Sequence, residues 1–175
     1  MLEGKLVRLR ALEKADVERE YRWINDQEVT QYLAARYPMS MTQEEEFIER
    51  QSRPGYSGLA LAIETKKGEH IGNISLVGPT HPEERMAPLG IMLGEREYWS
   101  RGYGTDAIRT LLAFAFQEMN LNRVWLQVHE DNARAIACYK KCGFVEEGRL
   151  RQHWFKGGHY HDMIAMGILR GEFEE

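Results

Sequence analysis

Strict alternation of apolar and polar residues predicts strands in several separate parts of the chain. The first is Leu6-Val-Arg-Leu-Arg-Ala-Leu12, and the later ones are richer in Val, Ile and Leu. The predicted strands cover residues 6–12, 59–64, 70–77, 86–93, 124–128, 145–156 and 159–169. The turn at 66–69 makes the second and third strands an antiparallel pair, and Lys156-Gly-Gly158 separates the last two.

Four helices are predicted between these strands. The first runs from Asp16 to about Ile24 and ends at Asn25-Asp26, and the second follows Ser40 or Thr42, either of which can cap it. After residue 105, apolar residues recur at helical spacing and define one buried face. They are Ile108, Leu111, Leu112, Ala115 and Met119. The fourth helix spans residues 132–141, and Gly143 predicts its left-handed cap.

The order of these elements, β-α-α-β-β-β-α-β-α-β-β, predicts an α+β fold. In such a fold one mixed central sheet is flanked by helices around a shared core. The 175 residues favour one domain spanning residues 1–175.

Composition excludes several broad classes of function. The formal net charge is −4 and no Lys/Arg block is present, so a nucleic-acid partner is not expected. Residues 1–10 lack the continuous apolar stretch of an export signal, and no segment approaches the roughly 20 apolar residues of a membrane helix. The chain is therefore expected to be cytoplasmic, without a membrane partner.

The segment from Leu89 to Thr105 is the first with a chemical signature. It reads Leu-Gly-Ile-Met-Leu-Gly-Glu-Arg-Glu-Tyr-Trp-Ser-Arg-Gly-Tyr-Gly-Thr and passes from a strand through a loop to a helix. Gly102 and Gly104 let successive backbone N–H groups converge at the helix N-terminus, an arrangement that holds phosphate oxygens. The segment lacks the third glycine of a dinucleotide fingerprint and the Gly-Lys-Ser/Thr of a P-loop. Taken alone, a flexible glycine-rich turn explains it equally well.

The second informative segment runs from Val128 to Phe144. Asn132 is placed to cap a short helix, and Tyr139, seven residues later, projects from roughly the same face. A structural cap and a packed tyrosine account for the two residues when each is taken separately. Their combination with the glycine-rich loop, one helix and one strand earlier, favours a common functional site.

Together the two segments resemble the GNAT superfamily of N-acetyltransferases. The matching residues are Tyr98-Trp-Ser-Arg-Gly-Tyr-Gly-Thr-Asp-Ala107 and Asp131-Asn-Ala-Arg-Ala-Ile136, followed by Tyr139-Lys-Lys-Cys-Gly-Phe144. The chain is most similar to the branch of the ribosomal-protein N-terminal acetyltransferases (RimJ/RimL) and the bacterial spermidine acetyltransferases. The resemblance spans essentially the whole chain. It departs at Trp99, where the superfamily commonly has Gln or Arg, and Arg101 is a nearby source of charge.

The resemblance implies a GNAT fold that binds acetyl-CoA, without a metal, where the parallel strands 86–93 and 123–130 diverge. Free backbone groups at the end of the first strand would pair with the pantetheine arm, and one N–H would polarise the thioester carbonyl. The implied coenzyme contacts are Ile91, Met92, Leu93, Trp99, Ser100, Arg101, Gly102, Tyr103, Gly104, Thr105, Asn132 and Ala135. A homodimer is compatible with this resemblance.

Tyr139 matches the proton donor of the family. A thiol pKa near 8.5 lies below the phenol value of about 10, so a hydrogen bond to the departing sulfur is a better role than complete proton transfer. The amine attacks the thioester directly in a ternary complex, so Cys138 and Cys142 are expected to be buried and not nucleophilic. Glu84, Glu95 and His81 are equal candidates for the general base.

The expected reaction is transfer of the acetyl group to a primary amine, either a protein N-terminus or a small molecule such as a polyamine. Residues 25–55, 78–86 and 155–160 are expected to set the acceptor. Transfer of another acyl group is the alternative within enzymes. A catalytically silent CoA-binding regulator is the alternative outside them, and the presence of Tyr139 argues against it.

Two further groups of polar residues have ordinary explanations. His153, His159 and His161 lack the carboxylate or cysteine pattern of a known metal site, so no metal is expected. Asp162 and Glu44-Glu45-Glu46 either hold a cationic acceptor or serve as capping and solvated groups.

Overall fold

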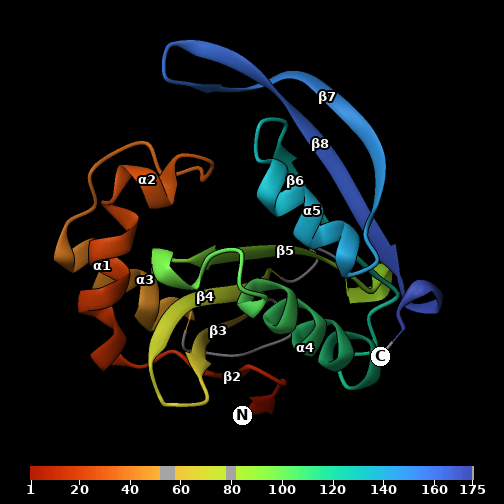
Figure 1. The fold of residues 1–175 in the computed structure, drawn as a ribbon, viewed down its shortest axis with the longest axis horizontal. Coiled ribbons are helices and arrows are strands. Elements are labelled where there is room, and N and C mark those ends of the chain that lie inside the picture. Colours follow the sequence, from red (N-terminus) through yellow and green to blue (C-terminus); the bar gives the residue numbers. More distant parts are fainter. Residues whose placement is uncertain (52–57, 78–81, 175) are drawn as a thin grey trace.

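The computed structural model describes residues 1–51, 58–77 and 82–174. In this part of the chain, eight strands form one sheet in the order β1-β2-β3-β4-β5-β6-β8-β7 (Figure 1). The strands are β1 (Leu2–Glu3), β2 (Val7–Ala11), β3 (Gly58–Thr65), β4 (His70–Val77), β5 (Met86–Leu93), β6 (Arg123–His129), β7 (Val145–Lys156) and β8 (His159–Leu169). The helices are α1 (Val17–Ile24), α2 (Gln27–Thr30), α3 (Met41–Gln51), α4 (Tyr103–Gln117) and α5 (Ala133–Lys141).

The predicted α+β class and mixed sheet are confirmed. Only the β5–β6 pair is parallel among the strand pairs of the described ranges; the other neighbours are antiparallel. The alternation pattern missed β1 and α2, because two and four residues are too short to show periodicity. Asp26, predicted to end a helix, also begins α2, since its carboxylate accepts a hydrogen bond from the Glu28 N–H at 2.8 Å.

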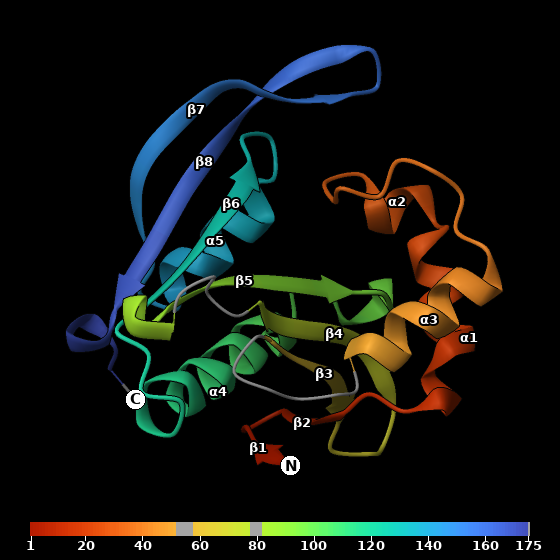
Figure 2. The same cartoon turned by 180° about the vertical axis from the view of Figure 1, so that it is seen from behind.

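Strand β3 separates two hydrophobic cores. Leu61 and Ile63 belong to the larger core with α4, whereas Ala60 and Ala62 pack with residues of α1 and α3. Because alternate side chains of a strand point to opposite faces, α4 covers one face of the sheet and the α1–α3 pair covers the other (Figures 1 and 2). None of the helices in the described part of the chain is long and apolar enough to cross a membrane.

Asp106 fixes the first turn of α4 against the N-terminal hairpin. Its carboxylate accepts hydrogen bonds from the backbone N–H groups of residues 5, 6 and 7 at 2.7–3.0 Å. Charge-assisted bonds of this kind are stronger than bonds between neutral groups. The turn between β1 and β2 therefore holds the start of α4, where the glycine-rich loop ends.

Charged side chains are buried between α1, α3 and β4. His70 Nδ1 lies 3.1 Å from an oxygen of Asp16, and His70 Nε2 lies 3.3 Å from an oxygen of Glu20. Glu44 is only 3% exposed, whereas Glu45 is exposed. Burial, together with the Glu20 carboxylate, raises the pKa of Glu44 to about 7. Glu44 is therefore not solvated, and residues 44–46 line neither of the cavities described below, so neither alternative offered by the sequence describes the whole run.

The raised pKa of Glu44 predicts a pH-dependent cost to folding. Its folded pKa of about 7 lies above the ordinary glutamate pKa of 4.5, so the folded state holds this proton more tightly. Stability is therefore lost as pH rises between these values, and the cost persists above pH 7. We expect Glu44→Gln to raise the free energy of unfolding at pH 8 by up to ~3 kcal/mol and to change it little at pH 4.5. Urea denaturation at both pH values measures this.

The matched control is Glu45→Gln, on the exposed face of the same helix. An equal effect of both substitutions at pH 8 would show that overall charge, and not burial, is responsible.

Candidate active site

The parallel pair at the centre of the sheet separates soon after it forms. β5 and β6 are paired only at Met86–Arg123, Ala87–Val124 and Pro88–Trp125. Beyond this point β5 remains paired with β4 as far as Leu93, and β6 remains paired with β8 as far as His129. The two strands therefore diverge, as predicted, and their facing edges do not pair with each other.

Pro88 marks the last paired position of β5. Proline has no N–H and is normally excluded from the middle of a sheet, so its presence indicates a strand that becomes an edge. Pro88 therefore marks in the sequence the point at which β5 and β6 separate. The alternation of apolar and polar residues does not show this point.

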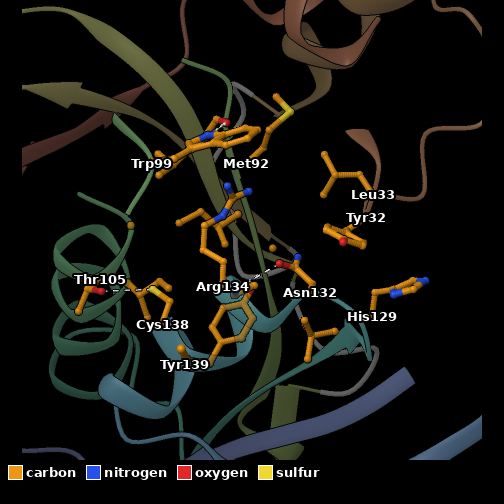
Figure 3. Close-up of a pocket in the computed structure, with 18 of the residues that line it drawn as sticks. Tyr32, Leu33, Met92, Trp99, Thr105, His129, Asn132, Arg134, Cys138 and Tyr139 are labelled. Carbon is orange, nitrogen blue, oxygen red and sulfur yellow. Dashed lines mark hydrogen bonds between the residues drawn. The ribbon is translucent and has the colours of Figure 1, made fainter. Parts of the chain in front are cut away.

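A cavity of about 490 Å³ occupies the divergence. It is bounded by β5, β6, the loop before α4, the first turns of α5 and the chain around α2 (Figure 3). The lining includes most residues that the sequence singled out: Ile91, Met92, Leu93, Trp99, Ser100, Gly102, Gly104, Thr105, Asn132, Ala135 and Tyr139. Arg101 and Tyr103 are the two of that set that do not line it.

The glycine-rich loop reaches the cavity through an unusual backbone conformation. Gly102 has φ of 89° and is the N-cap of α4, and Ser100 also has a positive φ of 57°. The N–H groups of the first turn of a helix have no partner within the helix and carry its positive end. The start of α4 therefore presents free donors at the wall of the cavity.

Arg134, and not Arg101, brings a positive charge to this wall. The Arg101 guanidinium donates to the Glu97 carbonyl at 3.1 Å, and its carbon lies 5.8 Å from the ring centre of Tyr98, outside the cavity. The Arg134 guanidinium carbon lies 3.8 Å from the ring centre of Trp99 and faces the lining (Figure 3). Trp99 is held in turn by a 2.8 Å hydrogen bond from its indole N–H to the Leu93 carbonyl. The tryptophan that departs from the family pattern thus supports an arginine whose role the sequence analysis missed.

Helix α5 contributes Asn132 and Tyr139 to one side of the cavity (Figure 3). The Asn132 side chain caps the helix by accepting the Ala135 N–H at 3.2 Å, as predicted. Tyr139 is 9% exposed, and its ring packs edge-on against Phe144 at 5.8 Å between ring centres. Burial raises the pKa of the Tyr139 phenol, so its hydroxyl keeps its proton throughout the physiological range.

The two cysteines differ more than expected. Cys142 is buried, but Cys138 is half-buried and lines the cavity, with its Sγ 3.3 Å from the Thr105 hydroxyl oxygen. Hydrogen bonding with Cys142, four residues along the same helix, and with Thr105 of the neighbouring helix lowers the pKa of the Cys138 thiol. The spacing of the two cysteines placed them on one face, but it gave no sign of the contribution of Thr105.

A second cavity, of about 850 Å³, adjoins the first. Gln31, Tyr32 and His129 line both cavities. The other walls come from the chain between residues 24 and 38 and from the β7–β8 hairpin around Lys156. These segments lie within the predicted acceptor regions 25–55 and 155–160. Part of the third region, residues 78–81, lies outside the described residues.

Lys156 joins the two walls of this second cavity. Its ammonium donates hydrogen bonds to the backbone carbonyls of Thr30, Leu33 and Ala35, the last two at 2.9 and 3.3 Å. The hairpin is thereby attached to the chain that follows α2.

Three polar residues meet near the junction of the cavities. His129 and His161 have ring centres 4.5 Å apart, and the Asp131 carboxylate lies 3.7 Å from His129 Nδ1 and 3.9 Å from His161 Nδ1. Their potential ligand atoms all fall within 4.8 Å of one another. The Asp131 N–H already donates to His129 Nδ1 at 3.1 Å, which occupies the lone pair of that neutral ring. The expectation of no metal stays a prediction.

The structure does not support the general bases suggested by the sequence. Glu95 accepts hydrogen bonds from Arg22 and from the Trp23 indole, and it lines neither cavity. Glu84 is exposed in the short turn before β5 and also lines neither. His81 lies outside the described residues. Position along the fourth strand was too weak a guide: Glu84 precedes the end of the strand away from the cavity, and Glu95, at the nearer end, is engaged by Arg22 and Trp23.

Comparison with known proteins identifies the family and the fold. Residues 7–145 match the family model described as Acetyltransferase (GNAT) domain. The spermidine N(1)-acetyltransferase of Vibrio cholerae is 27% identical over 165 residues, which cover 94% of each chain. The putative ribosomal N-acetyltransferase YdaF of Bacillus subtilis is 33% identical over 90 residues, or 51% of this chain and 49% of that protein.

The solved structures agree. The crystal structure of spermidine N-acetyltransferase from Vibrio cholerae in complex with CoA and spermine superposes with a TM-score of 0.88, at 27% identity and with 97% and 98% of the two chains covered. The resemblance inferred from residues 98–107 and 131–144 is therefore confirmed: the chain belongs to the GNAT family of acetyltransferases.

Proposed function

We propose that this acetyl-CoA-dependent N-acetyltransferase acts on the α-amine of a peptide or protein N-terminus. The observation that carries the proposal is the junction of the two cavities. The first has the backbone donors and positive charge of a coenzyme site, and the second opens from it at His129. Acetyl-CoA would occupy the first cavity and the amine would enter through the second.

The first cavity suits the coenzyme in both of its parts. The pyrophosphate would rest on the backbone N–H groups at the start of α4, with Arg134 nearby. The pantetheine arm would lie along the unpaired edge of β5 at Ile91–Leu93, pairing with it as a further strand would. An N–H on this edge is placed to polarise the thioester carbonyl, a contribution often worth ~3 kcal/mol.

Tyr139 is the proposed donor to the leaving sulfur. Its raised pKa makes complete proton transfer to a thiolate unfavourable, since the ordinary thiol pKa is about 8.5. A hydrogen bond from the phenol to the sulfur needs no such transfer and still stabilises the negative charge that forms as the C–S bond breaks.

The charges of the second cavity argue against a polycationic acceptor. Its lining has two permanent cations, Arg36 and Lys156, and one carboxylate, Asp131. Glu28 lines the first cavity, but its carboxylate is paired with Arg96. A polyamine carries several positive charges and needs several carboxylates nearby. A single amine on a neutral peptide needs only one carboxylate.

An α-amine also makes the smallest demand on the enzyme. With a pKa near 8 it is about a tenth neutral at pH 7, whereas an alkyl amine with a pKa above 10 is almost entirely protonated. Only the neutral amine attacks the thioester.

The acceptor is tested by a thiol-release screen with acetyl-CoA. The panel contains four kinds of acceptor. Two are peptides: hexapeptides with a free N-terminus, and hexapeptides with a blocked N-terminus and an internal lysine. The other two are spermidine and kanamycin. We expect the free N-termini to give the highest kcat/KM, because the acceptor cavity offers one carboxylate. Preference for spermidine or for the blocked lysine peptides would contradict the proposal. Coenzyme binding without transfer to any amine would favour a silent regulator.

The coenzyme site is tested by Gly102→Val. A φ of 89° is unfavourable for residues with a side chain, by roughly 1–2 kcal/mol. We therefore expect the loop to shift and acetyl-CoA affinity in calorimetry to fall about tenfold or more. Gly68→Val is the matched control, because Gly68 has φ of 85° but lies in the β3–β4 turn. Equal affinity in both variants would mean that the pyrophosphate binds elsewhere.

The role of Tyr139 is tested by Tyr139→Phe, which keeps the ring and removes the hydroxyl. We expect single-turnover acetyl transfer to slow by ~100-fold, the lower end for general-acid assistance, while acetyl-CoA affinity is retained. Tyr98→Phe serves as control, because the Tyr98 hydroxyl donates to Glu69 and Tyr98 does not line the cavity. Transfer at the wild-type rate would leave Tyr139 as a packing residue, and a loss of affinity would make it a ligand contact.

A further inference from the structure

We propose that His161 is the general base, accepting the proton that the acceptor amine loses as it attacks the thioester. This rests on the proposed function only in placing the amine in the second cavity. None of the bases that the sequence suggested lines that cavity in the described part of the chain, whereas His161 does.

His161 belongs to a row of three rings across neighbouring strands. β6, β8 and β7 are adjacent in the sheet, and they contribute His129, His161 and Trp154. Trp154 is directly opposite His161, and His129 is opposite Met163, two residues further along β8. The rings therefore lie on one face. This face borders the second cavity at the point where it meets the first.

The backbone assigns the same Nε2–H tautomer to both histidines but engages the Nδ1 lone pair of only one of them. The Asp131 N–H donates to His129 Nδ1 at 3.1 Å, so a neutral His129 carries its proton on Nε2 and its lone pair is occupied. His161 Nε2 lies 3.2 Å from the Lys156 carbonyl, which only accepts, so Nε2 carries the proton and Nδ1 keeps its lone pair. Of the two, only His161 has a free nitrogen with which to take a proton.

Burial and the neighbouring His161 lower the pKa of His129, which is 4% exposed. His129 therefore stays neutral as a donor through Nε2. The side chain of His161 is 25% exposed and can return a proton to solvent.

The Asp131 carboxylate completes the arrangement. It lies 3.9 Å from His161 Nδ1, close enough to stabilise an imidazolium. Two cations also line this cavity: the Lys156 ammonium is bound to three carbonyls, and Arg36 comes from the chain that follows α2. On the adjoining strands, Arg149 is paired with Glu130 and Asp162 at 2.7 and 3.0 Å.

Acetyl transfer to the amine exchanges a C–S bond for an N–C bond. The neutral amine attacks the thioester carbon, so an N–C bond forms, and the C–S bond then breaks. One N–H proton passes to His161 Nδ1, and the imidazolium releases it to solvent. The sulfur leaves as a thiolate with a hydrogen bond from Tyr139 and takes its proton from water.

The test compares His161→Gln with His159→Gln, using the fastest amine of the screen described above. His159 is exposed, two residues earlier on the same strand. We expect kcat/KM at pH 7.5 to fall by ~100-fold in His161→Gln and to change little in His159→Gln. Because the amine is chosen by activity, a preference for spermidine would overturn the proposed acceptor and leave this test intact.

The pH profile separates catalysis from structure. In the wild type both the amine and His161 must be unprotonated, so log(kcat/KM) should approach a slope of two against pH on the acidic side. In His161→Gln only the amine titrates, and the slope should be one. A loss of activity with the slope still two, or no loss at all, would overturn the proposal.

A second variant covers the case in which His161→Gln disturbs folding or acetyl-CoA affinity. Asp131 is largely exposed, with 65% of its side chain accessible, and Asp131→Asn keeps the N–H that donates to His129. We expect this change to lower the pH at which the slope of log(kcat/KM) changes from one to two, because the imidazolium loses its counter-charge. No change in that pH would overturn the proposal.

Discussion

The separation of β5 from β6 after three paired residues is the constraint on which the rest of the site depends. A central parallel pair normally satisfies its backbone groups along its whole length, and here it stops at Pro88 and Trp125. The cost of unpaired backbone is offset only if another partner supplies hydrogen bonds. The indole of Trp99 satisfies one of these groups, the carbonyl of Leu93. The others are left for water or for a bound molecule, which supports the proposal that the gap is the coenzyme site.

The walls of this gap are braced by contacts with other parts of the fold. Asp106 attaches the start of α4 to the N-terminal hairpin through three backbone N–H groups. Trp99 packs against the small cluster of Trp23, Val29 and Met92, and Arg134 of α5 lies over its ring. The loop is therefore braced from both sides of the divergence. Preorganised donors of this kind stabilise developing charge without having to move during the reaction.

The sequence was sufficient for most of the fold and for most of the residues that line the cavity between β5 and β6. Strand alternation, the helical spacing after Thr105 and the left-handed cap at Gly143, with φ of 95°, all depend on neighbours in the chain. What the sequence missed depends on distant contacts. The pKa of Glu44 is raised by burial and by Glu20, and Thr105 of another helix contributes to the lowered pKa of Cys138. The charge at the cavity wall comes from Arg134, because Arg101 turns toward Tyr98. Periodicity and short motifs contain no information about such pairs.

The attachment of Lys156 to Thr30, Leu33 and Ala35 links parts of the chain 121 to 126 residues apart. One ammonium satisfies three carbonyls, and a change in either partner leaves partly buried polar groups without these hydrogen bonds, which is destabilising. The chain that follows α2 and the β7–β8 hairpin therefore depend on each other structurally. Substitutions that broaden the acceptor range in one would need compensating changes in the other, and grafting a foreign loop alone would produce a loose acceptor pocket. An engineer seeking a new amine specificity on this scaffold would exchange both segments together.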